Sequence, residues 1–201
     1  ISISIGTLTV MMFSLGLVLL SKERSESALQ EAALKDALTG LANRRAIFEL
    51  LEQALSQARR SATPLAIAMV DVDHFKSIND RYGHLVGDEV LRRCTQHMQQ
   101  RLRRSDSVGR YGGEEFLLIL PGTEVAGAVA VLNMLRESVA HAPMHIDHQE
   151  IRVHFSTGVW CGVPGPGDTA DQLIQQADAA LYAAKTSGRN TVCLAPGCAT
   201  A

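Results

Sequence analysis

The sequence predicts an α+β fold in which a sheet rich in antiparallel pairs is covered by helices on one side. An apolar run of strand length, residues 64–70, follows a polar segment and predicts a buried strand. The pair Gly112-Gly113 separates two β-prone stretches, which is typical of a hairpin. Helical segments alternate with these strands, and that alternation with hairpins is typical of an α+β sandwich.

The first elements of the predicted domain run from a helix to this hairpin. A helix is expected over residues 44–60, because Ile47, Leu51 and Leu55 recur on one face. The elements expected next are a strand over 65–72, a helix over about 87–101, and hairpin arms over 107–111 and 116–120.

The later elements complete the sheet and its cover. We expect a helix over about 124–140 and then an extended stretch over 145–159, interpreted as a second hairpin. A loop rich in Pro and Gly precedes a helix over about 170–186, which Asp168 or Thr169 can cap and Gly188 can end. Residues 190–194 are the expected closing strand.

The hairpin turn carries two adjacent carboxylates, Glu114 and Glu115, directly after its two glycines. Paired glycines take positive φ at little steric cost, and they leave the backbone bare to an approaching ligand. Hard oxygen ligands suit Mg²⁺, and phosphates complete its octahedron. The turn therefore favours a divalent metal holding phosphates, whereas the alternative is an ordinary hairpin with solvated acids.

A second acidic group lies where the strand over 65–72 ends. A buried acid is costly unless a partner or a metal offsets its charge. Alternation places Asp71 and Asp73 on one side of the strand and Val72 on the other. Lys76 and Asn79 follow, a cation for phosphate and an amide able to read a base edge. The alternative is a strand that simply exits into a polar loop.

Taken with three further blocks, these segments resemble the GGDEF domain of the diguanylate cyclase family over residues 36 to about 192. The sequence departs from the family name at Glu114, where the name carries Asp, and either carboxylate binds a hard metal. The matching blocks are D-A-L-T-G-L-A-N-R-R (36–45), D-V-D-H-F-K-S-I-N-D-R-Y-G-H-L-V-G-D-E-V-L (71–91), R-R-S-D (103–106), R-Y-G-G-E-E-F (110–116) and A-D-A-A-L-Y-A-A-K-T-S-G-R-N (177–190).

This resemblance implies a palm-like fold related to polymerase and adenylyl cyclase cores. It implies an enzyme that joins two GTP molecules into cyclic di-GMP and releases pyrophosphate, with Mg²⁺, or alternatively Mn²⁺, in a two-metal site. Each subunit would hold one GTP, so the resemblance also implies a homodimer. The alternative is a non-catalytic receptor of the same fold that binds GTP or cyclic di-GMP, although the acids and glycines needed for catalysis are all present.

The resemblance assigns the chemistry of the site to particular residues. Asp71, the Val72 carbonyl and Glu114 would hold the metals. Glu115 would be a further ligand or help to take the proton of the 3′-hydroxyl group, so Glu114 and Glu115 are the expected catalytic residues. The phosphates would be bound by Lys76, Lys185 and Arg189.

Base selection and feedback would involve other residues of the same blocks. Asn79 and Asp88 would read guanine, because a carboxylate can accept from its N1–H and N2–H₂ groups and not from adenine N1. Alternatively, Asp88 caps a helix that starts near Gly87. His84 would line the nucleotide pocket or pack at the helix entry. Arg103 and Asp106 match an inhibitory R-x-x-D site for cyclic di-GMP.

The N-terminal residues read as a membrane segment and a linker. Residues 1–21 carry no charge and are long enough to span a bilayer, and Lys22 and Arg24 favour a cytoplasmic location for the domain after them. We expect an inner-membrane anchor at the end of a longer membrane region, with a buried core helix as the alternative. The expected divisions are the anchor over 1–21, a helical linker or dimeric signalling helix over 22–35, the catalytic domain over 36–196 and a tail over 197–201.

The net charge and the spacing of the cysteines give only weak limits on the function and location of the protein. The net charge of −2 gives no indication of nucleic acid as a partner. The cysteines show no C-x-x-C pairing, and scattered thiols fit a reduced cytosolic domain better than a disulfide framework.

Overall fold

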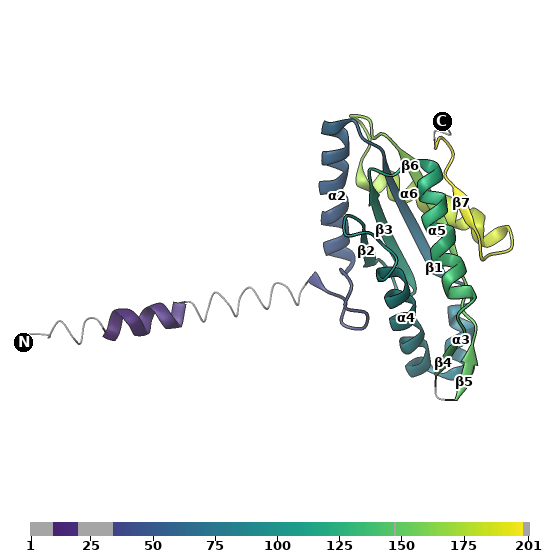
Figure 1. Ribbon diagram of the computed structural model, residues 1–201, viewed down its shortest axis with the longest axis horizontal. Coiled ribbons are helices and arrows are strands. Elements are labelled where there is room, and N and C mark those ends of the chain that lie inside the picture. The colour runs from purple at the N-terminus through teal and green to yellow at the C-terminus, as the bar shows by residue number, and fades with distance from the viewer. Residues whose placement is uncertain (1–9, 20–33, 147, 199–201) are drawn as a thin grey trace, which may run out of the picture. The chain divides into compact units, whose positions relative to one another are not determined.

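The computed structural model describes residues 10–19, 34–146 and 148–198, and its contacts divide the chain into Ile1–Lys35 and Asp36–Ala201. In the first unit, residues 10–19 are helical and are coloured purple in Figure 1. No helix among the described residues has both the length and the apolar composition needed to cross a membrane. Most of the expected membrane segment (residues 1–9, 20 and 21) and of the linker (22–33) lies outside the described residues.

The second unit is built on a central sheet in which the described strands are ordered β2-β3-β1-β6-β7 (Figure 1). All neighbours pair antiparallel except β6 and β7, which are parallel. The expectation of an α+β fold with an antiparallel-rich central sheet is confirmed. The strands are β1 (Leu65–Val72), β2 (Ser107–Arg110), β3 (Glu115–Pro121), β6 (Phe155–Gly162) and β7 (Val192–Leu194).

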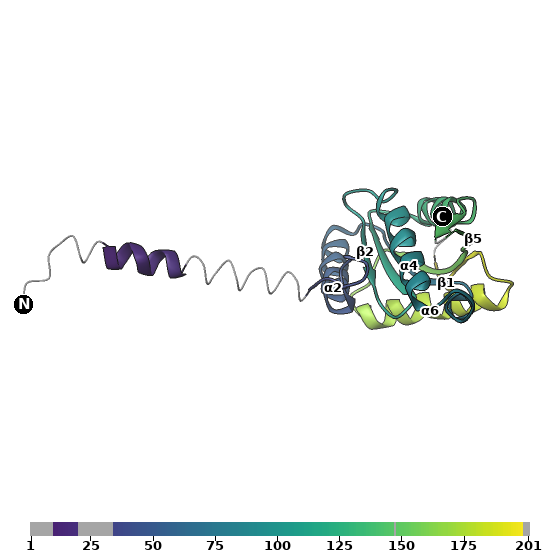
Figure 2. The ribbon, with the colours of Figure 1, turned by 90° about the horizontal axis from the view of Figure 1, so that it is seen from below.

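Helices cover both faces of this sheet, so the expectation of helices on one side only is wrong. On one face α2 (Arg44–Ser61) and α6 (Ala170–Thr186) pack against Leu65, Ile67 and Met69 of β1. On the other, α4 (His84–Gln99) and α5 (Val125–Ala140) pack against the alternate residues of β1, and Figure 2 shows the strands between α6 and α4. All residues of β1 are buried, because a continuous apolar run belongs to a strand enclosed on both sides.

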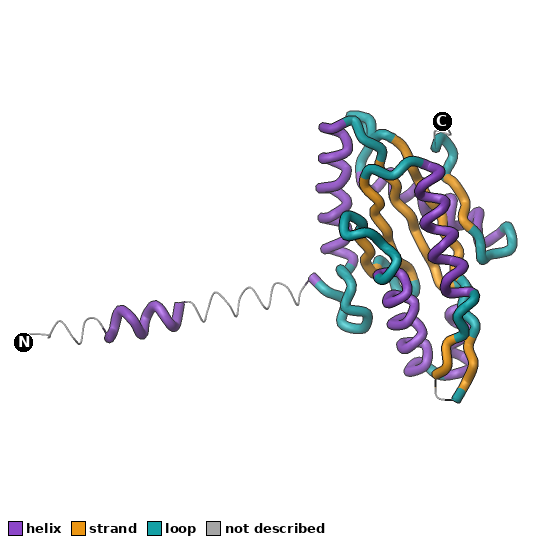
Figure 3. Tube along the Cα trace, in the orientation of Figure 1, coloured by secondary structure: helices purple, strands orange, loops and turns teal. Residues whose placement is uncertain are grey.

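Two local expectations change. The helix expected over 87–101 begins at His84, and a further helix, α3 (Phe75–Tyr82), occupies a stretch for which no helix or strand was expected. Only Phe75 and Ile78 of α3 are buried, which is too few apolar positions to reveal its period from the sequence. The second hairpin is a small separate sheet of β4 (Met144–Ile146) and β5 (Gln149–Ile151), visible at one end of Figure 3.

The start of α6 confirms a predicted cap. The Thr169 hydroxyl accepts from the Gln172 N–H at 3.3 Å, and the Gln172 side chain accepts from the Thr169 N–H at 3.0 Å. This reciprocal pair satisfies two backbone donors that the helix itself leaves unpaired. It holds the start of the helix whose other end carries Lys185.

Candidate active site

The acids expected at the site lie together where β1 ends and β3 begins. Asp71 lies directly opposite Glu115 in the sheet register, and the Val72 N–H donates to the Glu114 carbonyl at 3.2 Å. The alternation of the strands places Asp71 and Glu115 on the sheet face covered by α2 and α6. The structure thus brings the two acidic groups found in the sequence to one place.

The Gly-Gly turn forms the expected hairpin, but not through positive φ. Neither Gly112 nor Gly113 lies in the left-handed region, so that expectation is wrong. A Cβ at 112 would lie 2.4 Å from Glu115 Oε2, so any larger residue there would displace the end of the Glu115 side chain from its present position. The Glu115 side chain therefore packs against bare backbone, and its carbonyl accepts from the Tyr111 and Gly112 N–H groups at 2.8 and 3.2 Å.

Lys185, at the end of α6, forms an ion pair with Asp71. Lys185 Nζ lies 2.7 Å from Asp71 Oδ2, an ion pair in which the Asp71 side chain is almost fully buried. Burial raises the pKa of Asp71, and the charges of Lys185 and Arg189 oppose that rise. Lys185 and Arg189, expected at the phosphates, are thus close enough to act on the same carboxylate.

The donor set fits a hard divalent cation. Burial raises the pKa of Glu114, and the neighbouring Asp71 charge raises it further, so these carboxylates are costly to ionise together without added positive charge. Among the described residues, no three His, Cys, Asp or Glu side chains form a ready-made metal cluster. Two carboxylates supplemented by the backbone carbonyl of Val72 fit Mg²⁺, which takes few protein ligands and completes its shell with water and phosphate.

The residues expected to read the base lie together on α3 and α4. Asn79 packs so closely on Gly87 that a Cβ there would lie 1.9 Å from Asn79 Oδ1. That buried oxygen has no hydrogen-bond partner among the described residues. Asp88 follows Gly87 in sequence and is half-buried, while Lys76 is exposed on α3.

The start of α4 decides between two readings of Asp88. Helix α4 begins at His84 with Gly83 as its N-cap, so Asp88 lies inside the helix, and the capping alternative is wrong. His84, the first residue of the helix, is exposed rather than packed into the core. Both side chains are left available for a ligand.

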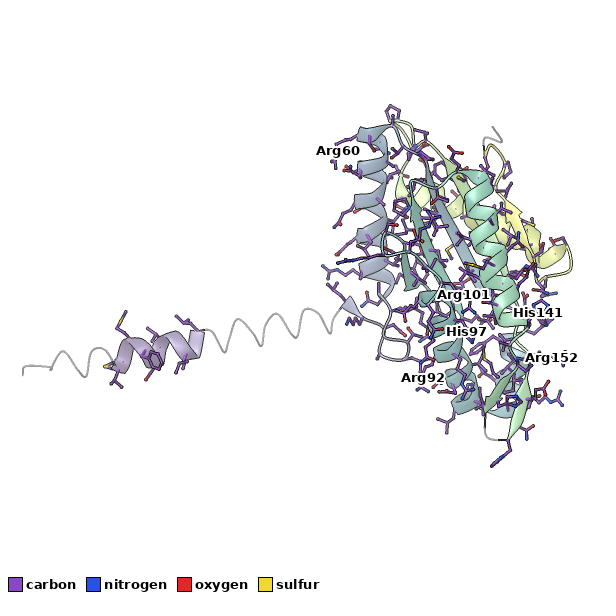
Figure 4. All side chains as sticks on the ribbon, in the orientation of Figure 1. Arg60, Arg92, His97, Arg101, His141 and Arg152 are labelled. Carbon is purple, nitrogen blue, oxygen red and sulfur yellow. The ribbon has the colours of Figure 1, made fainter. Side chains whose placement is uncertain are left out.

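Arg103 and Asp106 form a turn at the end of β2 remote from the Gly-Gly turn. Asp106 Oδ2 accepts from the Arg103 N–H at 2.9 Å, and the Arg103 side chain is exposed. Helix α4, which leads into this turn, carries Arg92 and His97, with Arg101 just beyond its end (Figure 4). The motif is therefore assembled locally by the turn itself.

The sequence did not predict a link from the start of the domain to the Gly-Gly turn. Arg110 Nη1 lies 3.1 and 3.2 Å from the two carboxylate oxygens of Asp36. The same guanidinium donates to the Gly113 carbonyl at 2.6 and 3.1 Å. Asp36 and Arg110 both belong to blocks that match the family. They are 74 positions apart in the sequence, so no local pattern predicts their contact.

Comparisons with known proteins agree with this geometry. The family model "Diguanylate cyclase, GGDEF domain" matches residues 33–191. Diguanylate cyclase DgcP of Pseudomonas aeruginosa is 39% identical over 161 residues, which cover 80% of this chain and 24% of that protein. Response regulator PleD of Caulobacter vibrioides is 40% identical over 164 residues, covering 81% and 36%. The chain thus spans about a quarter to a third of these curated relatives.

Solved structures extend the similarity to the fold. The coiled coil and GGDEF domain of DgcB from Caulobacter crescentus, in complex with c-di-GMP, matches with a TM-score of 0.88 at 29% identity, covering 94% of this chain and all of that one. The active GGEEF domain of a diguanylate cyclase from Vibrio cholerae matches with a TM-score of 0.71 at 35% identity, covering 77% and 97%. The second structure carries Glu in its motif, as this chain does at Glu114.

Proposed function

The chain belongs to the GGDEF domain family of diguanylate cyclases, and from that premise we propose that residues 36–196 condense two GTP molecules into cyclic di-GMP. One observation carries the proposal: Asp71, Glu114 and Glu115 converge with Lys185 at the end of β1. Acids for metals and cations for phosphates therefore share one site, as a nucleotidyl transfer requires.

Asp71, Glu114 and the Val72 carbonyl would hold Mg²⁺ or Mn²⁺. When bound, these ions neutralise the leaving phosphates and activate the attacking oxygen. The side chains of the protein supply the remaining positive charge for the phosphates. Lys76, Lys185 and Arg189 bind phosphate oxygens, and the forked guanidinium group of an arginine can bind two of them at once.

Each 3′-hydroxyl oxygen forms a bond to the α-phosphorus of the other GTP, and pyrophosphate leaves as the old bond breaks. Glu115 takes the hydroxyl proton. Asn79 and Asp88 read guanine, and His84 lines the nucleotide pocket. Because one site holds one GTP, two copies must face each other, so we propose a homodimer as the active form.

Incubating the protein with GTP and Mg²⁺ and separating the products tests the proposal. Glu114→Gln keeps the shape of the side chain and removes its charge, so synthesis should fall by more than about 100-fold while the fold survives. The exposed acid Glu52 on α2 provides the control variant Glu52→Gln, which should leave the rate unchanged. Turnover of folded Glu114→Gln within a few-fold of wild type would sink the assignment.

The same experiment separates the enzyme from a non-catalytic receptor. A receptor would bind GTP or cyclic di-GMP by calorimetry and make no product at any protein concentration. The proposed dimeric enzyme should instead show a specific activity that rises with protein concentration, because the two half-sites must meet.

We propose feedback through Arg103 and Asp106, and two features of the turn support it: Asp106 Oδ2 accepts from the Arg103 backbone N–H, and Arg103 is exposed. Arg103→Ala should weaken inhibition by added cyclic di-GMP at least about tenfold and leave the initial rate unchanged. Progress curves with and without added product measure this. Unchanged inhibition would mean that the motif is only a turn.

We also propose that residues 1–21 anchor the protein in the inner membrane and leave the catalytic domain in the cytoplasm. The uncharged composition of that segment, followed by Lys22 and Arg24, supports this. Fractionation of cells expressing the chain tests it, with a variant lacking residues 1–21 as the control. Recovery of both proteins in the same fraction would contradict the proposal.

A further inference from the structure

Asp73 is a buried acid with no role in the proposed chemistry. It is 6% exposed, and each of its carboxylate oxygens accepts a hydrogen bond from the protein. Oδ1 accepts from the Ser156 hydroxyl at 2.7 Å, and Oδ2 accepts from the Asn190 N–H at 2.9 Å. A carboxylate engaged in this way is tied to protein partners on β6 and on the segment after α6, rather than free for a metal.

The segment that Asp73 holds has an unusual backbone. After α6 ends, Gly188 has φ of 116°, and the next two residues, Arg189 and Asn190, have φ of 64° and 45°. A left-handed conformation costs a residue such as Arg of the order of 1–3 kcal/mol and persists only where the surroundings impose it, whereas Asn adopts it more readily. The conformation of Arg189 therefore needs restraint from its neighbours.

Hydrogen bonds on both sides of the turn supply that restraint. The Arg189 N–H donates to the Ala184 carbonyl at 3.1 Å and continues the end of the helix, and the Thr191 carbonyl accepts from the Thr157 N–H of β6 at 2.9 Å. The Asn190 side chain accepts from Arg136 of α5 at 3.2 Å. The Asn190 backbone N–H is held by Asp73, and this bond is charge-assisted and its acceptor is buried, which strengthens it.

The restrained turn presents Arg189, whose side chain is exposed. Its charge acts on Asp71, because it opposes the rise that burial and the neighbouring Asp73 charge cause in the pKa of that carboxyl group. A guanidinium that can swing freely loses more conformational entropy on binding than one whose backbone is already set. The conformation of residues 189–190 therefore affects how well Arg189 meets a ligand.

We propose that Asp73 is a positioning residue: by holding the Asn190 amide it sets the left-handed turn that presents Arg189 to the nucleotide phosphates. The identity of the ligand rests on the proposed function, whereas the control of the turn by Asp73 does not. Asp73 acts through Arg189 and touches no reacting atom.

Amide exchange tests the structural half without any need for activity. In Asp73→Ala the Asn190 N–H loses its acceptor, so its exchange rate, measured by NMR, should rise at least about tenfold. In Asp73→Asn the side-chain oxygen still accepts one bond, so part of the protection should return. If exchange at Asn190 is the same in wild type and folded Asp73→Ala, the proposal is overturned.

Steady-state kinetics test the functional half. Asp73→Ala should raise the KM for GTP about tenfold, and in the Arg189→Ala background the same change should have almost no further effect. If Asp73 had a purely structural role, the effects of the two substitutions would instead add. Additive effects of the two substitutions would refute the link to Arg189.

Two adjacent buried hydroxyl groups of β6 offer a matched pair of milder variants. Ser156 donates to Asp73, whereas the Thr157 hydroxyl has no hydrogen-bond partner in the described part of the chain. Ser156→Ala should raise the KM for GTP severalfold, and Thr157→Val should not. Equal effects of the two would mean that disturbance of the core, rather than Asp73, controls the site.

A failure of the proposed function can be distinguished from a failure of the role proposed for Asp73. If the wild-type protein makes no cyclic di-GMP, the proposed activity has failed. The affinity for GTP, measured by calorimetry, then replaces KM in the comparison of Asp73→Ala with and without Arg189→Ala. Amide exchange at Asn190 still decides whether Asp73 holds the turn. Loss of affinity in Asp73→Ala without a change in exchange would also overturn the proposal.

Discussion

At the scale of single residues, one sign of a ligand is the unpaired side-chain oxygen of Asn79, which lies close to the half-buried residue Asp88. Asn79 Oδ1 is buried and unpaired among the described residues, and Asp88 lies next to the glycine against which Asn79 packs. Buried acceptors without donors cost free energy until a ligand supplies them. Guanine offers adjacent N–H donors on one edge, whereas adenine places an acceptor at N1, so these residues suit guanine.

The first prediction concerns that choice of base. Asp88→Ser replaces a charged acceptor by a hydroxyl group that can donate or accept, which relaxes the rejection of adenine. The variant should lose GTP activity and admit ATP, giving some adenine-containing dinucleotide when both nucleotides are supplied and the products are separated. Asp80→Ser, which changes an exposed acid of α3, is the control. A strictly guanine-only product at a near-normal rate would show that Asp88 does not read the base.

At the scale of elements, the site depends on how closely α6 packs on β6. Gly158 of β6 lies under the helix, and a Cβ there would be 2.0 Å from the Leu181 nitrogen and 2.1 Å from the Ala177 carbonyl oxygen. These are backbone atoms of a helix, which cannot rotate away as a side chain can. The absence of a side chain at 158 therefore determines the distance of Lys185 and Arg189 from the acids.

The second prediction concerns this contact. Gly158→Ala should lower the free energy of unfolding by about 3 kcal/mol, because the whole helix must shift to admit one methyl group. Urea denaturation measures the loss. Gly167→Ala, at a position with open space around it, is the matched control and should change stability by less than about 0.5 kcal/mol. Equal stability of the two variants would contradict the packing argument.

The elements also show what can be predicted from the sequence. The sequence predicts the bounds of β1 and α6 correctly, because an apolar run, a capping residue and a terminating glycine are local signals. Helix α3 was missed, since two buried residues in one short segment do not display a helical period. The contact of Lys185 with Asp71 joins residues far apart in the chain, and nothing in the sequence besides family resemblance relates them.

At the scale of the whole domain, one ion pair connects its first residue to the Gly-Gly turn. Asp36 binds Arg110, which also holds the Gly113 carbonyl, and the Asp36 carboxylate accepts from the Thr39 N–H and hydroxyl at 2.8 and 2.6 Å. Burial alone would raise the pKa of Asp36, but the hydrogen bonds from Thr39 and Arg110 outweigh it and lower that pKa. The folded domain therefore favours the ionised form.

The third prediction follows from the lowered pKa of Asp36. A carboxyl group whose pKa is lower in the folded state contributes stability above its ordinary pKa, 3.8, and loses it as the pH falls through the folded value. Asp36→Asn should therefore cost about 1–2 kcal/mol at pH 7, and the difference from wild type should shrink below pH of about 4. Urea unfolding at several pH values measures it. A difference that stays constant down to pH of about 2 would contradict this account.

The lengths of the strands affect the outcome when two such domains meet. The inner strands β1 and β6 have 8 residues each, whereas the outer strands β2 and β7 have 4 and 3. Beside β2, the Ala42 carbonyl already accepts from the Arg110 N–H at 2.8 Å. Long free edges recruit strands from other molecules and lead to aggregation. The edges that the described strands expose are therefore short, which disfavours a continuous sheet between the proposed partners and favours an encounter that ends in separation rather than in a fibril.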